Sequence, residues 1–80
     1  EQIICDKGYV ELKRGETFDI TYQLYDTEAH DVNFSVAKGD YAVSVEGNKI
    51  IAKSEGLAAV KVELSDSAEK SYDIVLVKVI

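Results

Sequence analysis

Apolar and polar residues alternate along most of the chain with a period of two. Residues 17–25 show the pattern most clearly: apolar side chains occupy Phe18, Ile20, Tyr22 and Leu24, and polar ones occupy Thr17, Asp19, Thr21 and Gln23. Successive side chains of a β-strand point to opposite faces of a sheet, so this alternation predicts a strand with one buried face. No stretch repeats apolar residues at the i, i+3, i+4 spacing of an amphipathic helix. The sequence therefore predicts an all-β fold.

Groups of turn-forming residues divide the alternating runs into about seven short strands. The predicted strands are residues 3–12 (broken near Gly8), 17–25, 32–37, 42–46, 49–53, 57–64 and 71–79. Glycine supplies the conformational freedom for a kink, so we expect the first strand to pass from one sheet to the other at Gly8. Short strands at this spacing are typical of a two-sheet antiparallel β-sandwich.

The shared parity of the apolar positions also predicts the core. Its members are Val10, Leu12, Phe18, Ile20, Tyr22, Leu24, Phe34, Val43, Val45, Ile50, Val60, Val62 and Val77. Fully burying side chains of this size stabilises the fold by roughly 1.5–3 kcal/mol each. We therefore expect the chain to fold without a disulfide.

The last predicted strand does not alternate cleanly. Tyr72, Ile74 and Leu76 share one parity, and Val75, Val77 and Val79 share the other. Lys78 must face water, which places Val77 and Val79 inside. We predict a β-bulge near Ile74 and Val75 that shifts the register. The alternative is that Leu76 or Ile74 contributes to an exposed apolar contact surface.

Two stretches resemble the bacterial Ig-like domain of group 2, a module of intimin- and invasin-type adhesins and other surface proteins. Residues 10–18 (VELKRGETF) match the family's opening V-x-L-x-x-G-E-T-apolar. Residues 45–62 match a valine, a glycine-containing turn, an apolar-x-Ala strand, a turn ending in Gly56 and a further alternating strand. The resemblance extends from about Tyr9 to Val79. Phe34 stands where the family usually has tryptophan, and Asn48 where it usually has glycine.

The resemblance implies a single Ig-like domain over residues 1–80, with Phe34 in the central place of the family's tryptophan. It implies a non-catalytic structural or adhesion module of a bacterial cell-surface or secreted protein, acting as a spacer or binding-presenting bead in a domain array. The implied partners are neighbouring domains of the same chain and a host surface protein or glycan. The chain begins at Glu1 and contains no methionine, so we expect it to be a piece of a longer multidomain protein.

Composition and charge exclude several other classes. The chain has a net charge of -6 and therefore lacks the excess of basic residues that nucleic-acid binding requires. No apolar run approaches the roughly 20 residues that span a bilayer. A lone Cys5 excludes an internal disulfide and, with a single His30, a zinc finger. Because no serine or cysteine near His30 and Asp31 has the context of a nucleophile, we expect neither an enzyme nor a cofactor.

Three groups of residues are candidates for contacts or ligands. Cys5 lies between apolar neighbours and is predicted to be a buried small hydrophobe. Carboxylates in two connections are weak calcium candidates, although they lack EF-hand spacing and we expect them to be solvated: Asp26, Glu28, Asp31, Asp66 and Glu69. Three tyrosines are candidates for stacking on a ligand such as a sugar: Tyr9, Tyr25 and Tyr41. They motivate the alternative function of a carbohydrate-binding accessory domain attached to a secreted enzyme.

The connections of an Ig-like sandwich fall at two ends, and their charges differ. One end would carry a net charge of -4, from Asp26, Glu28, Asp31, Glu46, Asp66 and Glu69 against Lys49 and Lys70. The other would carry +1, from Lys13, Arg14, Lys38 and Lys53 against Glu16, Asp40 and Glu55. In a head-to-tail array of similar domains, opposite charges would meet at each junction.

Overall fold

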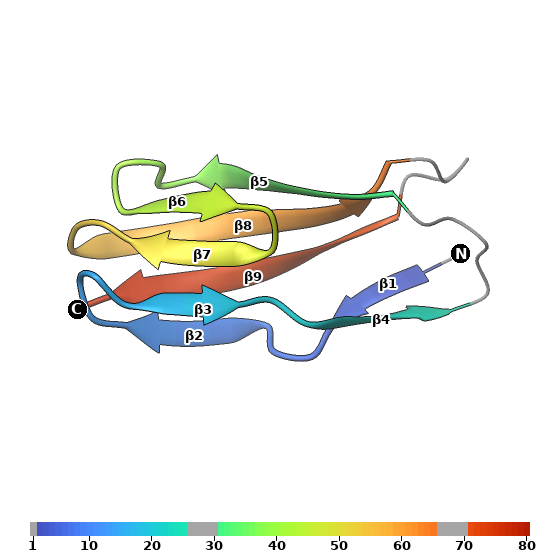
Figure 1. The fold of residues 1–80 in the computed structure, drawn as a ribbon, viewed down its shortest axis with the longest axis horizontal. Helices are drawn as coiled ribbons and strands as arrows, with labels where there is room; N and C mark the ends of the chain where they lie inside the picture. The colour runs from blue at the N-terminus through green and yellow to red at the C-terminus, as the bar shows by residue number, and fades with distance from the viewer. Residues whose placement is uncertain (1, 26–30, 66–70) are drawn as a thin grey trace.

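The computed structural model describes residues 2–25, 31–65 and 71–80, which form β-strands and no helix. The strands are β1 (Gln2–Cys5), β2 (Tyr9–Leu12), β3 (Thr17–Asp19), β4 (Tyr22–Tyr25), β5 (Val32–Lys38), β6 (Val43–Glu46), β7 (Lys49–Ala52), β8 (Gly56–Leu64) and β9 (Tyr72–Val79). The all-β prediction is confirmed. The molecule is elongated, with extents of 37 × 18 × 16 Å, and the N- and C-termini lie toward opposite ends (Figure 1).

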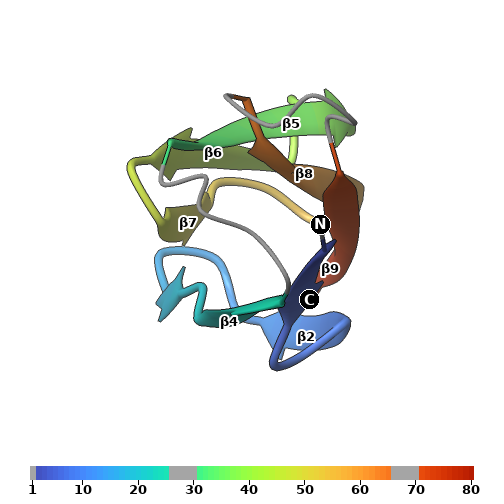
Figure 2. The same ribbon diagram turned by 90° about the vertical axis from the view of Figure 1, so that its right-hand side faces the viewer.

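The strands form three hydrogen-bonded sheets. One sheet has four strands in the order β2-β9-β8-β5, another has the order β3-β7-β6, and β1 pairs with β4 in a ribbon. These pairs are antiparallel, except that β2 runs parallel to β9. Seen along the molecule, the four-stranded sheet curves around one side, β6 lies beside β5, and β7 and β4 face β8 and β9 across the interior (Figure 2). The core lies between them.

The predicted strand 3–12 breaks where glycine was expected to break it. β1 pairs with β4, whereas β2 pairs with β9. The chain therefore passes from one sheet to another around Gly8, as predicted.

The predicted strand 17–25 is also divided, although its alternation is unbroken. The backbone N–H of Ile20 donates to the carbonyl oxygen of Asn48 (2.7 Å), and Asn48 Nδ2 donates to the carbonyl oxygen of Ile20 (3.0 Å). Both backbone groups of Ile20 are thus bonded to the turn between β6 and β7. Ile20 remains buried, so the break leaves the alternation of side chains unchanged.

Most of the predicted core is confirmed. Eight predicted members are buried: Val10, Leu12, Ile20, Val43, Ile50, Val60, Val62 and Val77. Four more are partly buried and pack against these: Phe18, Tyr22, Phe34 and Val45. The core also contains residues outside that predicted set: Ile3, Ala42, Ala52, Ala58, Leu64 and Val75, together with Cys5 and Val79, whose burial was predicted separately.

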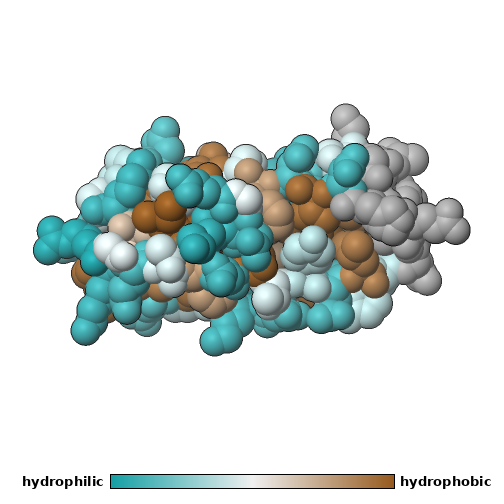
Figure 3. Space-filling view, in the orientation of Figure 1, coloured by the Kyte–Doolittle hydropathy of each residue, from teal (hydrophilic) through white to brown (hydrophobic). Residues whose placement is uncertain are grey.

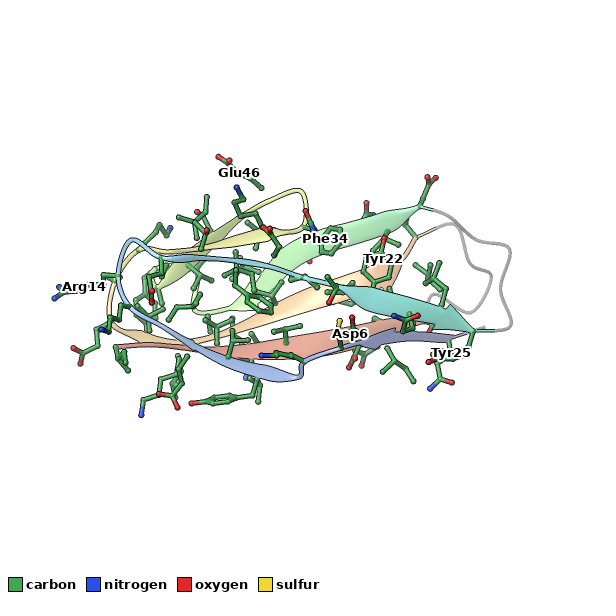
Figure 4. The ribbon with its side chains drawn as sticks, turned by 60° about the horizontal axis from the view of Figure 1, so that its bottom comes forward. Asp6, Arg14, Tyr22, Tyr25, Phe34 and Glu46 are labelled. Atoms are coloured by element: carbon green, nitrogen blue, oxygen red, sulfur yellow. The ribbon has the colours of Figure 1, made fainter. Side chains whose placement is uncertain are left out.

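Leu24 and Phe34 depart from the prediction. The β6–β7 turn lies beside Ile20, so β4 extends past the β3-β7-β6 sheet and Leu24 is 37% exposed. Phe34 lies on β5, an outer strand of its sheet, and its ring centroid is 6.1 Å from that of Tyr22 (Figure 4). It is only partly buried, so the central place predicted for it is wrong. Its partner on β8, Val62, is fully buried.

Strand β9 contains no bulge. Its pairing with β8 runs from Gly56 opposite Val79 to Glu63 opposite Tyr72 without a shift, so the predicted bulge near Ile74 and Val75 is wrong. A register shift lies in β5, between Val36 and Lys38. The alternative interpretation applies, because regular alternation buries Val75 and leaves Leu76 51% exposed.

Two glycines allow the connection between β5 and β6 to pack against the start of β8. Gly39 has φ +77°, and a Cβ there would lie 2.8 Å from Ala58 Cα. Gly56 has φ +154°, and a Cβ there would lie 2.5 Å from the hydroxyl oxygen of Tyr41. L-residues rarely adopt either conformation.

We predict that Gly56→Val destabilises the protein by about 2 kcal/mol or more, because it combines backbone strain with a clash against Tyr41. Glu55→Val is the control, since Glu55 is exposed in the adjacent turn. Urea unfolding of both variants provides the measurement. Equal losses of stability would refute the turn argument.

We also predict that Asn48→Gly lowers the free energy of unfolding by roughly 0.5–1.5 kcal/mol. Glycine keeps the conformational freedom of the turn, so the change isolates the side-chain hydrogen bond to Ile20. Lys49→Gly, at an exposed position beside the turn, controls for the added backbone entropy. If Asn48→Gly is no more destabilising than this control, the hydrogen bond from the Asn48 side chain does not stabilise the break in the strand at Ile20.

Candidate binding surface

The four-stranded sheet has an apolar surface on the side facing away from the core. We call this surface the outer face. Its side chains alternate with the buried ones along three strands: Tyr9 and Glu11 on β2, Leu57, Ala59, Lys61 and Glu63 on β8, and Tyr72, Ile74, Leu76 and Lys78 on β9. Leu57 is 67% exposed and Tyr9 is 50% exposed. The surface over β3, β6 and β7 is mostly hydrophilic with scattered apolar areas (Figure 3).

A shallow hollow of about 180 Å³ lies in the outer face. It is lined by Lys38, Leu57, Ala58, Ala59 and Leu76. Ala59 pairs with Leu76 on one side and with Lys38 on the other. Because the side chain of Ala59 is small, the surface of the sheet is recessed there, between the side chains of Leu57 and Leu76. The lining is almost wholly apolar, which suits an apolar side chain better than a polar ligand.

The charges of the outer face are nearly balanced. Lys61 Nζ lies 3.4 Å from Glu63 Oε2 and 4.7 Å from the centre of the Tyr72 ring. Lys78 pairs across the strands with Leu57 and with Glu11. The apolar surface is therefore bordered by both signs of charge.

The three candidate tyrosines are exposed but do not form one site. Tyr9 lies on the outer face, opposite Leu76. Tyr25 is 48% exposed at the end of β4, toward one end of the molecule (Figure 4). Tyr41 is 61% exposed and lies in the connection before β6, toward the other end (Figure 1). Tyr9 neighbours the hollow through its pairing with Leu76, and Tyr41 lies against Gly56, next to Leu57.

Most of the weak calcium candidates lie outside the described residues: Asp26, Glu28, Asp66 and Glu69. His30 also lies outside them. Asp31 is described. Its carbonyl oxygen accepts hydrogen bonds from the N–H (2.9 Å) and the hydroxyl (3.1 Å) of Ser65, which join the start of β5 to the end of β8. Within residues 2–25, 31–65 and 71–80, no group of three or more His, Cys, Asp or Glu side chains is placed to hold a metal ion.

The predicted charge polarity needs one correction. Arg14 lies at one end of the molecule and Tyr25 lies toward the other, with Glu46 between them (Figure 4). Glu46 and Lys49 flank the turn that bonds to Ile20, midway along the run 17–25, so neither belongs to the acidic end. Of the remaining acidic residues assigned to that end, only Asp31 is described.

Cys5 is buried, as predicted, and connects β1 to β9 through Asp73. The backbone N–H of Cys5 donates to Asp73 Oδ2 (2.8 Å), and that of Ile3 donates to Ser71 Oγ (3.3 Å). Burial and then the negative charge of Asp73 raise the pKa of the Cys5 thiol to about 11. The thiol is therefore protonated and a poor nucleophile near neutral pH. Sequence reasoning had not assigned a role to Asp73.

Comparison with family models and with curated proteins found no match for this chain. No helix that could cross a membrane occurs in the part of the chain that the structure describes.

The Cys5 environment predicts a loss of stability at high pH. The folded protein holds the thiol proton up to a pKa of about 11, whereas the unfolded chain releases it near 9.0. The stabilising contribution is complete below pH 9 and is lost as the pH rises toward 11. We expect the stability difference between the parent and Cys5→Ala, measured by urea unfolding, to shift against the parent in this window. A constant difference from pH 8 to pH 11 would contradict the assignment.

Proposed function

We propose that this chain is an Ig-like β-sandwich module with a non-catalytic structural or adhesive role in a bacterial cell-surface or secreted protein. It would serve as a spacer or as a bead that presents a binding surface. Its partners would be neighbouring domains of the same chain and a host surface protein or glycan.

The order of the strands supports the Ig-like part of this proposal. The ribbon β1-β4 and the sheet β3-β7-β6 share the divided run 17–25, which gives the combined order β1, β4/β3, β7, β6. Opposite them, β5, β8 and β9 are neighbours, with β2 added to β9. Ig-like sandwiches place their first, second, fifth and fourth strands in one sheet and their third, sixth and seventh in the other. The order β1, β4/β3, β7, β6 against β5, β8, β9 parallels this order and supports the proposal, with β2 as an addition to the second sheet.

The observation that carries the spacer role is the position of the two termini. The chain begins near one end of a body 37 Å long and finishes near the other (Figure 1). Joining such modules in series extends the array by almost the full length of each module. The connections at 13–16 and 53–55 lie at the C-terminal end, where the N–H of Gly15 donates to Ala52 and that of Ile80 to Leu12. These connections would adjoin the next domain.

A carbohydrate-binding accessory domain is the second candidate. Tyr9 favours it, because an exposed aromatic ring beside a hollow can stack on a sugar. The separation of Tyr9 from Tyr25 and Tyr41 argues against an extended aromatic platform. A glycan array distinguishes the two functions. Saturable binding that Tyr9→Ala abolishes and Tyr25→Ala preserves would favour the second candidate.

Small-angle scattering of two copies of the chain joined in tandem tests the spacer role. We expect a maximum dimension near twice the 37 Å of one module, in dilute solution. If charge aligns the two copies, a change from low to high salt will broaden the distribution of interdomain distances, because screening confines such contacts to about 8 Å at physiological salt. Unchanged dimensions would refute alignment by charge, and compaction specific to calcium would favour the metal candidates. Two copies folded back side by side would refute the spacer role if they did so even with the exposed Leu57 replaced by Glu in both copies, which prevents contact between their apolar sheet faces.

A further inference from the structure

We infer that the outer face binds a second copy of this chain, with Leu57 of each copy seated in the hollow of the other. The inference rests on the geometry and charge of the four-stranded sheet and does not depend on the proposed function.

The first argument is the apolar character of the outer face. When one face of a sheet is packed on the core, the other face is normally polar. Here Tyr9, Leu76 and Ala59 form a continuous row across β2, β9 and β8. Leu57 and Leu76 are both more than half exposed. A contiguous apolar surface of this kind marks an interaction site.

The second argument is self-complementarity. A dimer with two-fold symmetry brings the same patch of each copy together, so the patch must contain both a projection and a matching recess. The outer face has both features. Leu57 is 67% exposed at the rim of a hollow of about 180 Å³, whose floor includes Ala59 and whose far side is Leu76.

The third argument is electrostatic. The chain carries a net charge of -6, so most approaches of one copy to another bring like charges together. On the outer face, three lysines stand against two glutamates, a net charge of +1: Lys38, Lys61 and Lys78 against Glu11 and Glu63. Two acidic copies therefore meet less repulsion at this surface than at a surface with a net negative charge. The opposite signs along its border also allow pairing between copies.

The size of the surface sets the strength of the contact. The four strands hold 28 residues, which at about 3.3 Å per residue and about 4.8 Å between strands cover roughly 440 Å² per copy. A dimer would bury roughly 900 Å² in total, which is in the range of weak, transient contacts. We therefore expect a weak dimer, with a Kd of about 10 μM to 1 mM.

Sedimentation equilibrium of the chain, from about 10 μM to 1 mM, tests the inference. We expect the average mass to rise from monomer toward dimer. Higher salt should strengthen association, because it screens the overall negative charge. Leu57→Glu places a charge in the apolar contact and should weaken association by about tenfold or more. Ile4→Glu is the matched control, because Ile4 is also an exposed apolar residue (42%) but lies on β1, outside the outer face.

A second variant and a spectroscopic readout locate the contact. Leu76→Glu, on the far side of the hollow, should weaken association as Leu57→Glu does. Amide NMR shifts that change with dilution should concentrate on Leu57, Ala59 and Leu76. Circular dichroism confirms that each variant is folded. A monomer at every concentration and salt would overturn the inference and leave the outer face to a different partner. Equal weakening by Ile4→Glu and Leu57→Glu would also overturn it.

Discussion

Strands β8 and β9 pair continuously, from Gly56 opposite Val79 to Glu63 opposite Tyr72, and the other strands are arranged around this pair. β5 adds to the free edge of β8, and β2 adds in parallel to the second half of β9. At the start of β9, Asp73 and the preceding residue Ser71 contact β1, because their side chains accept N–H hydrogen bonds from Cys5 and Ile3. Backbone donors on β1 are thus satisfied without a continuous strand ladder, as buried polar groups require.

Regular pairing also separates the two sides of this pair of strands. Apart from Asp73 near the start of β9, the inward side is apolar and buried: Ala58, Val60, Val62, Leu64, Val75, Val77 and Val79. Because no bulge interrupts β9, Leu76 must face outward, and it meets Leu57 and Ala59 at the hollow. The surface proposed to bind a second copy therefore follows from the same register that builds the core. The elongated shape and the separated termini, which support the spacer proposal, follow from the length of β8 and β9 along the molecule (Figure 1).

Alternation in the sequence predicted the class of fold, most of the core and the break at Gly8, because each depends on local residue types. It could not reveal the break at Ile20, since the side chain keeps its inward parity while its backbone bonds to a distant turn at Asn48. Leu24 and Phe34 have core-like parity, but their burial depends on how far the opposing sheet extends. Such lengths are properties of the tertiary structure.

The candidate surface was only partly predictable. Two interpretations of Leu76 were possible: a register shift nearby, or an exposed position in a contact surface. The sequence has no local signal that decides between them. Leu57 was missed although a signal existed, because it shares the parity of the outward-facing Lys61 and Glu63. The hollow depends on Ala59 lying between Lys38 and Leu76 across three strands, which only the register reveals. The part played by Asp73 likewise depends on its approach to β1.

The most direct test of the account is the accessibility of β9, residue by residue. Single cysteines placed in turn at positions 74–78 of the Cys5→Ala protein can be reacted with a thiol reagent under native conditions. Regular pairing predicts slow labelling at positions 75 and 77 and fast labelling at 76 and 78. Slow labelling at position 76 and fast labelling at position 77 would mean that the alternation reverses after position 75. This result would contradict the continuous register and remove the basis for the outer face.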